Sequence, residues 1–181
     1  MKKVIIPIFI LLLVSSVSKA QWPSNVTKVE SKANDSVLVS GDLAAGALME
    51  DLSWAANSSN ACFPATQNLK FRGNHVLYAT SLPPRSILTI SVTPTDANGD
   101  LSIYGYMMGN KEYMIVPNLP GCITCEADHK WDGKWKGKVQ TSERKIEFQN
   151  PTQNTYNIVI GVSAPKDVTT GQFTLKLKLK S

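Results

Sequence analysis

The chain has 181 residues, with 19 Lys and Arg residues against 14 Asp and Glu residues and a hydrophobic content of 43%. This length fits one domain, or one domain with a tail, and the hydrophobic content excludes a disordered chain. Three lysines lie in the first twenty positions, which leaves 16 of the 19 basic residues against the 14 acidic ones. Because that excess is small, the composition does not indicate a nucleic-acid-binding protein.

Residues 1–20 have the pattern of a secretory signal peptide. Two lysines at the start precede the apolar run Val4–Val14, and the small residues Ser18 and Ala20 predict cleavage before Gln21. The apolar run is about half of the roughly 20 residues that a transmembrane helix needs. We therefore expect a secreted or periplasmic protein of bacterial type, with no membrane span after cleavage.

Alternating apolar and polar residues dominate the rest of the chain. Residues 21–35 are polar without a period and predict a lead-in. From Ser36 onward, short alternating segments predict β-strands, because alternation places one row of side chains on each face of a strand. These segments, separated by Gly, Pro and Asn, centre on residues 37–39, 75–81, 88–92, 101–104, 146–148, 156–162 and 173–179. Only one short segment, 42–57, indicates a helix.

This order of elements predicts an all-β protein, with a single antiparallel β-sandwich domain over residues 36–181. Residues at about 109–138 interrupt the alternation with prolines and two cysteines, and we expect them to form an insertion. Within the insertion, Asp132 and Gly133 predict the turn of a β-hairpin.

Several of the strand-like segments are similar to those of the bacterial pre-peptidase C-terminal domain: HVLYAT from His75, SILTISV from Ser86, GDLSIY from Gly99, TYNIVIGV from Thr155 and GQFTLKL from Gly171. The resemblance covers roughly residues 36–108 and 143–180. It implies a jelly-roll-like β-sandwich without catalytic activity, of a kind found in secreted bacterial proteins. It also implies a binding role, since some members of that family bind polymers or calcium.

Three cysteines, Cys62, Cys122 and Cys125, remain in the predicted mature chain. In an oxidising compartment at least one pair should form a disulfide. Either Cys122 bonds to Cys125, or Cys62 reaches one of them across the fold. We take Cys122 and Cys125 as the expected pair. A zinc site that adds His129 to these cysteines is the alternative use of the cluster.

The sequence does not contain a recognisable catalytic set. It has two histidines, His75 and His129, as candidate bases. It contains no Gly-x-Ser-x-Gly motif, Walker loop, dinucleotide fingerprint or His-Glu-x-x-His motif. Nucleophilic catalysis needs a base oriented beside a nucleophile. A hydrolase is therefore the least favoured class, and we expect a protein that is not an enzyme.

Aromatic residues are the best candidates for a binding surface. Trp131 and Trp135 flank the predicted hairpin turn among several lysines, and such rings bury a large area at low entropic cost. Tyr104 and Tyr106 share one face of a predicted strand and are a second candidate, although packing is their commoner role. We expect a module that binds polysaccharide or an extracellular protein. An envelope protein that docks on a partner polypeptide is the alternative.

Asp96 and Asp100 lie in the turn-rich stretch DANGD, where oxygen donors surround a glycine. Oxygen donors at this spacing suit calcium, although the stretch lacks the bidentate Glu of an EF-hand loop. We therefore expect calcium as an optional ligand at Asp96 and Asp100, and no required cofactor.

Overall fold

The computed structural model of the chain describes residues 21–49, 51–57, 62–63, 65–134 and 136–181. The predicted signal peptide and Trp135 lie outside these ranges. Within them, no helix is both long enough and apolar enough to cross a membrane.

Strands are the predominant regular structure of the described chain. The strands are β1 (Val26–Lys28), β2 (Asp35–Asp42), β3 (Ala47–Leu48), β4 (Asn74–Leu82), β5 (Ser86–Pro94), β6 (Ser102–Gly109), β7 (Thr124–Asp128), β8 (Arg144–Asn150), β9 (Tyr156–Ser163) and β10 (Gln172–Lys180). The short helices are η1 (Leu43–Ala45), α1 (Ser53–Asn57) and η2 (Ala65–Phe71), of which η1 and η2 are 3-10 helices.

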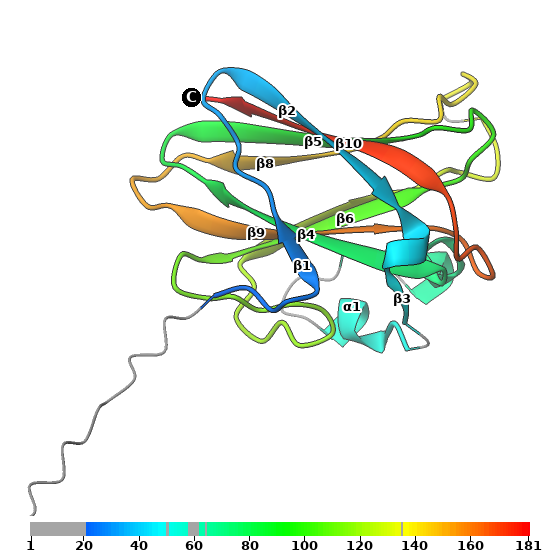
Figure 1. The fold of residues 1–181 in the computed structure, drawn as a ribbon, viewed down its shortest axis with the longest axis horizontal. Coiled ribbons are helices and arrows are strands. Elements are labelled where there is room, and N and C mark those ends of the chain that lie inside the picture. The colour runs from blue at the N-terminus through cyan, green and yellow to red at the C-terminus, as the bar shows by residue number, and fades with distance from the viewer. Residues whose placement is uncertain (1–20, 50, 58–61, 64, 135) are drawn as a thin grey trace, which may run out of the picture.

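The strands form two sheets that pack face to face (Figure 1). One sheet has the order β1-β4-β9-β6-β7, with β3 paired to β4, and the other has the order β2-β10-β5-β8. Neighbouring strands are antiparallel except β1, which runs parallel to β4. The predicted all-β, antiparallel sandwich is therefore confirmed.

The space between the two sheets is filled by what we call the inter-sheet core. It consists mainly of Leu, Ile and Val side chains from β4, β5, β6, β8, β9 and β10, together with Phe148 and Phe173. Strand β10 follows the predicted alternation, because Phe173, Leu175 and Leu177 are buried and its lysines are exposed. Burial of each such side chain contributes roughly 1.5–3 kcal/mol.

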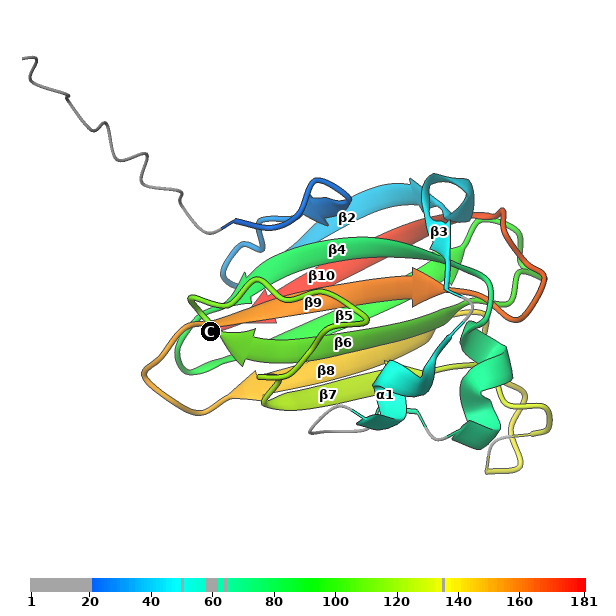
Figure 2. The same ribbon diagram turned by 90° about the horizontal axis from the view of Figure 1, so that it is seen from below.

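A second hydrophobic cluster, which we call the outer core, covers the other face of the six-stranded sheet. Figure 2 shows α1 and the chain between β6 and β7 lying over that face. Its buried members are Leu52, Trp54, Ala55, Phe63, Phe71, Leu77, Tyr104, Tyr106, Met108, Val116, Leu119, Cys122 and Val159. Strands β6 and β9 are consequently buried on both faces.

Two segments differ from the sequence-based expectation. The expected lead-in at 21–35 contributes β1, in which Val26 is paired with Leu77, so this segment belongs to the sheet. The expected insertion contains β7, which forms the edge of the six-stranded sheet. Both strands are short, so their sequences carry too little alternation to be recognised.

Candidate functional site

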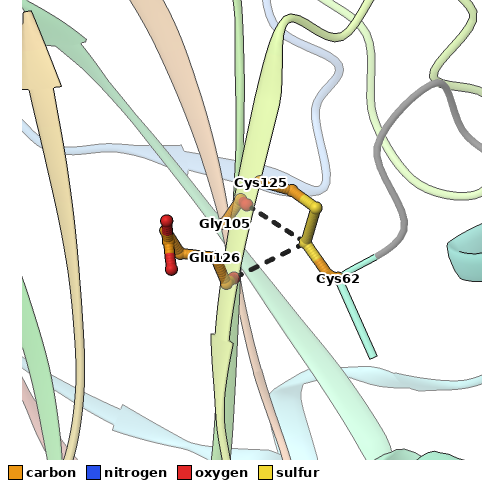
Figure 3. Close-up of a disulfide and its surroundings, with 4 residues drawn as sticks. All are labelled: Cys62, Gly105, Cys125 and Glu126. Carbon is orange, nitrogen blue, oxygen red and sulfur yellow. Dashed lines mark hydrogen bonds between the residues drawn. A yellow bond between two sulfur atoms is a disulfide. The ribbon is translucent and has the colours of Figure 1, made fainter. Parts of the chain in front are cut away.

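The disulfide joins Cys62 to Cys125, with Cα atoms 5.5 Å apart, so the expected pairing of Cys122 with Cys125 is wrong. Figure 3 shows Cys125 and Glu126 pointing to opposite sides of β7, with Cys125 on the side from which Cys62 approaches. The Cys62 sulfur also lies 3.8 Å from the carbonyl oxygen of Gly105. Cys122 instead packs into the outer core at 5% exposure, and its N–H donates to the carbonyl of Leu119 in a turn.

The disulfide also decides between the uses of the cysteine cluster. Because Cys125 is bonded to Cys62, its sulfur is not a thiolate ligand for zinc. Among the described residues, no group of three or more His, Cys, Asp or Glu side chains is placed to hold a metal ion. A disulfide of this kind is consistent with a location outside the cytoplasm.

Tyr104 and Tyr106 do not form a binding surface, and this part of the binding prediction is wrong. Both side chains are fully buried in the outer core, where Trp54 contacts both rings. The Tyr104 hydroxyl lies 2.9 Å from Nδ1 of His75. Burial raises the pKa of Tyr104 well above its ordinary value. These rings therefore stabilise the fold.

The loop between β7 and β8, residues 129–143, holds the remaining aromatic candidate at one end of the sandwich (Figure 1, yellow). Trp131 is 40% exposed. The predicted turn at Asp132 and Gly133 is misplaced, because the positive φ angles of a type I′ turn occur at Lys136 (50°) and Gly137 (76°).

Side chains fix this loop along its length. The Gln140 amide oxygen accepts from the Trp131 N–H at 2.9 Å, and its nitrogen donates to the carbonyls of Trp131 and Gly133 at 2.9 and 2.6 Å. Lys70 forms an ion pair with Asp132, and this hydrogen-bonded contact lowers the pKa of that carboxyl. These contacts tie Trp131, Asp132 and Gly133 to Gln140 and to Lys70 outside the loop.

The loop encloses a groove of about 540 Å³. The groove is lined by Asp128, Trp131, Lys136, Lys138, Val139, Gln140, Thr141 and Arg144. Two of these residues are exposed apolar side chains, since Val139 is 84% exposed and Trp131 40%. The groove therefore combines an aromatic ring with converging cations, which is the composition of a binding site for a ligand with apolar and anionic parts.

Buried polar groups lie beneath the groove. His129 is only 8% exposed, and its ring lies 4.8 Å from that of Trp131. Burial lowers the pKa of His129. Four nearby charges also act on it: Asp128, Lys70, Arg144 and Asp100. The sandwich end thus brings Asp100, which was predicted for calcium, to the neighbourhood of the Trp131 loop.

Arg144 is the residue of this site that the sequence does not reveal. It begins β8, is 5% exposed, and donates from Nη2 to the Thr141 carbonyl. Its Nε–H is buried without a hydrogen-bond partner among the described residues. Nothing in a single sequence distinguishes a buried arginine from a solvated one, because burial here depends on where the 129–143 loop folds back.

Asp96 and Asp100 have different surroundings. Asp96 is exposed, and its carboxylate accepts from the Asn98 N–H at 2.9 Å within the turn. Asp100 is half-buried, with one carboxylate oxygen that has no partner among the described residues. Calcium at this pair therefore stays a prediction.

The fold and groove define the chain as a disulfide-bonded β-sandwich with a loop-borne groove at one end. No protein-family profile matches it, and no curated protein does. In solved structures it is similar to the pre-peptidase C-terminal domain of a collagenase from Bacillus anthracis, with 10% identity over 89% of this chain and 100% of that one and a TM-score of 0.37.

Two other solved structures are similar to a comparable degree. CorA, a surface-associated copper-binding protein of Methylomicrobium album BG8, is 13% identical over 85% of this chain and 98% of its own, with a TM-score of 0.45. Aeromonas hydrophila PliG, a periplasmic inhibitor of g-type lysozyme, is 8% identical over 86% and 97%, with a TM-score of 0.33. Similarities at this level do not assign a function, so the function has to be argued from the groove itself.

Proposed function

We propose that this protein is a secreted or periplasmic binding module, without catalytic activity, that contacts an extracellular polymer or protein through the 129–143 groove. The observation that carries the proposal is the exposed Trp131 ring beside Lys136 and Lys138 on a loop held in place by Gln140. An aromatic side chain fixed before binding loses little conformational entropy when a ligand covers it.

The surroundings of the two histidines support a binding role over a catalytic one. His75 is 3% exposed; its Nε2 donates to the Phe71 carbonyl at 2.7 Å, and its Nδ1 accepts from the Tyr104 hydroxyl. Among the described residues, neither His75 nor His129 has a hydrogen bond to a Ser, Thr or Cys side chain, which a nucleophile–base pair would require.

Location outside the cytoplasm rests on two features. The first twenty residues have the pattern of a signal peptide, and disulfides such as Cys62–Cys125 form mainly in oxidising compartments. Both features favour ligands that are present in the periplasm or at the cell surface.

The proposal is tested by comparing the wild type with Trp131→Ala on a panel of immobilised polysaccharides and on proteins from the cell envelope. Trp22→Ala is the matched control, because Trp22 is half-buried against Tyr113, with ring centroids 5.4 Å apart, and lies outside the groove. We expect Trp131→Ala to abolish retention while Trp22→Ala retains it. Equal retention by both variants would contradict the proposal, and loss of retention only on a protein would select the partner-docking alternative.

A further inference from the structure

The ligand chemistry of the groove is decided by its charges. Lys134, Lys136 and Lys138 are exposed at every second position of the loop, and Arg144 lines the groove beneath them. The single carboxylate among the lining residues, Asp128, already accepts from the backbone N–H of Lys145 at 2.8 Å. The groove therefore presents a net positive surface that attracts an anionic ligand.

Arg144 supplies a second, independent feature. Its side chain is more than nine-tenths buried, yet its Nε–H has no partner among the described residues, while Nη2 is held by the Thr141 carbonyl. A buried donor without an acceptor is destabilising, so an acceptor that reaches it gains free energy on binding. A carboxylate is the acceptor whose planar pair of oxygens matches a guanidinium group.

The backbone of the loop argues against an extended peptide as the ligand. A peptide that adds to a sheet or loop edge bonds to free backbone N–H and C=O groups. In this groove the N–H and C=O of Trp131 are both bonded to the side chain of Gln140. Trp131 is 40% exposed, and the C–H face of a sugar ring stacks on exposed aromatic rings.

Building on the proposed function, we infer that the groove binds a carboxylated polysaccharide, with a sugar ring on Trp131, one uronate carboxylate at Arg144 and neighbouring carboxylates at Lys136 and Lys138. Attraction of this kind weakens as salt concentration rises.

The test measures binding of the purified protein to polygalacturonate by isothermal titration calorimetry, with dextran, dextran sulfate and polyglutamate as comparison polymers. We expect polygalacturonate to bind most tightly and dextran not to bind. Tighter binding of polyglutamate would overturn the inference in favour of an acidic protein, and tighter binding of dextran sulfate would overturn it in favour of a sulfated ligand.

Variants locate the interaction. Arg144→Lys keeps the charge but loses the guanidinium fork, and we expect binding to polygalacturonate to weaken about tenfold. Lys136→Gln/Lys138→Gln should weaken it to a similar degree without affecting folding, since both positions are exposed. The control Lys178→Gln/Lys180→Gln makes the same charge change on β10, and binding should remain within about twofold of wild type.

The outcomes separate this inference from the proposed function. If Trp131→Ala abolishes binding to some polymer but carboxylates confer no preference, the inference fails and the binding module stands. If the control lysines weaken binding as much as the groove lysines, or if no polymer binds, the inference fails. If Trp131→Ala also leaves retention on every polymer and protein unchanged, both fail.

Discussion

The two faces of the six-stranded sheet are buried in different ways. The inter-sheet core is built from regular strands of both sheets, whose aliphatic side chains alternate with outward polar ones. The outer core is rich in aromatic side chains and is covered by α1, η2 and loops, with a disulfide across its edge. Regular strands pack on each other through their alternation, whereas the irregular cover needs a covalent link and specific polar contacts to stay in place.

The largest expected effect comes from removing the disulfide. The double variant Cys62→Ser/Cys125→Ser opens a link between positions 63 residues apart, which costs roughly 4 kcal/mol in the chain-entropy description. The melting temperature should fall by about 10 °C. Hydrogen exchange should show the outer core losing protection, while β5, β8 and β10 keep theirs.

Cys122→Ala is the control for that experiment, because it removes a buried sulfur and leaves the disulfide intact. Its loss of stability should be well below that of the double variant. A non-reducing peptide map that links Cys122 to Cys125, or uniform loss of protection across both sheets, would contradict the distinction between the two cores.

Two glycines on the neighbouring strands β9 and β6 test how tightly each core is packed. A Cβ atom on Gly161 would overlap the ring of Tyr104 in the outer core, whereas one on Gly105 would meet Phe148 Cε2 at 2.8 Å in the inter-sheet core. Overpacking of a core costs typically 1–3 kcal/mol. We expect Gly161→Ala to lie near the upper limit, at about 3 kcal/mol, because Tyr104 is fixed by its bond to His75.

Gly105→Ala should cost less, about 1 kcal/mol, since a shift of the Phe148 ring edge relieves the contact and alanine gains over glycine in a strand. Urea denaturation of the two variants measures both changes in the free energy of unfolding. Equal losses would mean that the outer core accommodates volume as readily as the inter-sheet core.

How far the sequence predicts this molecule depends on which core is considered. Phe173, Leu175 and Leu177 alternate with polar residues that face solvent, so the two-residue period of this strand can be recognised in the sequence. Tyr104 and Tyr106 lie on a strand buried on both faces, and a sequence cannot show that Trp54 and its neighbours fold over them. Whether Tyr104 and Tyr106 are exposed therefore cannot be predicted from the sequence, because helix α1 and loops cover this face of the sheet.

The composition of the 129–143 groove was predictable in the same partial way. Trp131 and the surrounding lysines are evident from composition, but Arg144 and Gln140 gain their roles only when the loop folds back. The turn at Lys136 and Gly137 could have been favoured by its glycine, yet Asp132 and Gly133 have the stronger local signal. In the fold, Gly133 bonds to Gln140 and Asp132 pairs with Lys70, and neither contact is evident from the local sequence.

The outer core also makes the stability of the protein depend on pH, through the buried His75 that bonds to Tyr104. Burial lowers the pKa of His75 to about 4 from 6.5, and its bond to the Phe71 carbonyl opposes this only in part. The unfolded chain therefore binds a proton between pH 6.5 and 4 that the folded chain does not. Stability is retained above pH 6.5 and falls as the pH is lowered, by about 2 kcal/mol at pH 5 from His75 alone.

This contribution is isolated by comparing wild type with His75→Gln in urea denaturation at pH 7, 6 and 5. The lowered pKa of His129 acts in the same direction in both proteins, so it cancels in the difference. The wild type should lose more stability than His75→Gln over this range. Parallel slopes would show that the outer core tolerates a charged imidazole.

The smallest expected effect concerns calcium, which would bind outside both cores in the β5–β6 turn. Calcium takes six to eight oxygen ligands, but Asp96 and Asp100 have different surroundings, and no third carboxylate joins them within the described chain. We expect binding no tighter than about millimolar, so 1 mM calcium raises the melting temperature by about 1 °C relative to chelator. Asp96→Asn should remove that difference. A shift of several degrees would require a better ligand set than these carboxylates provide and would contradict this expectation.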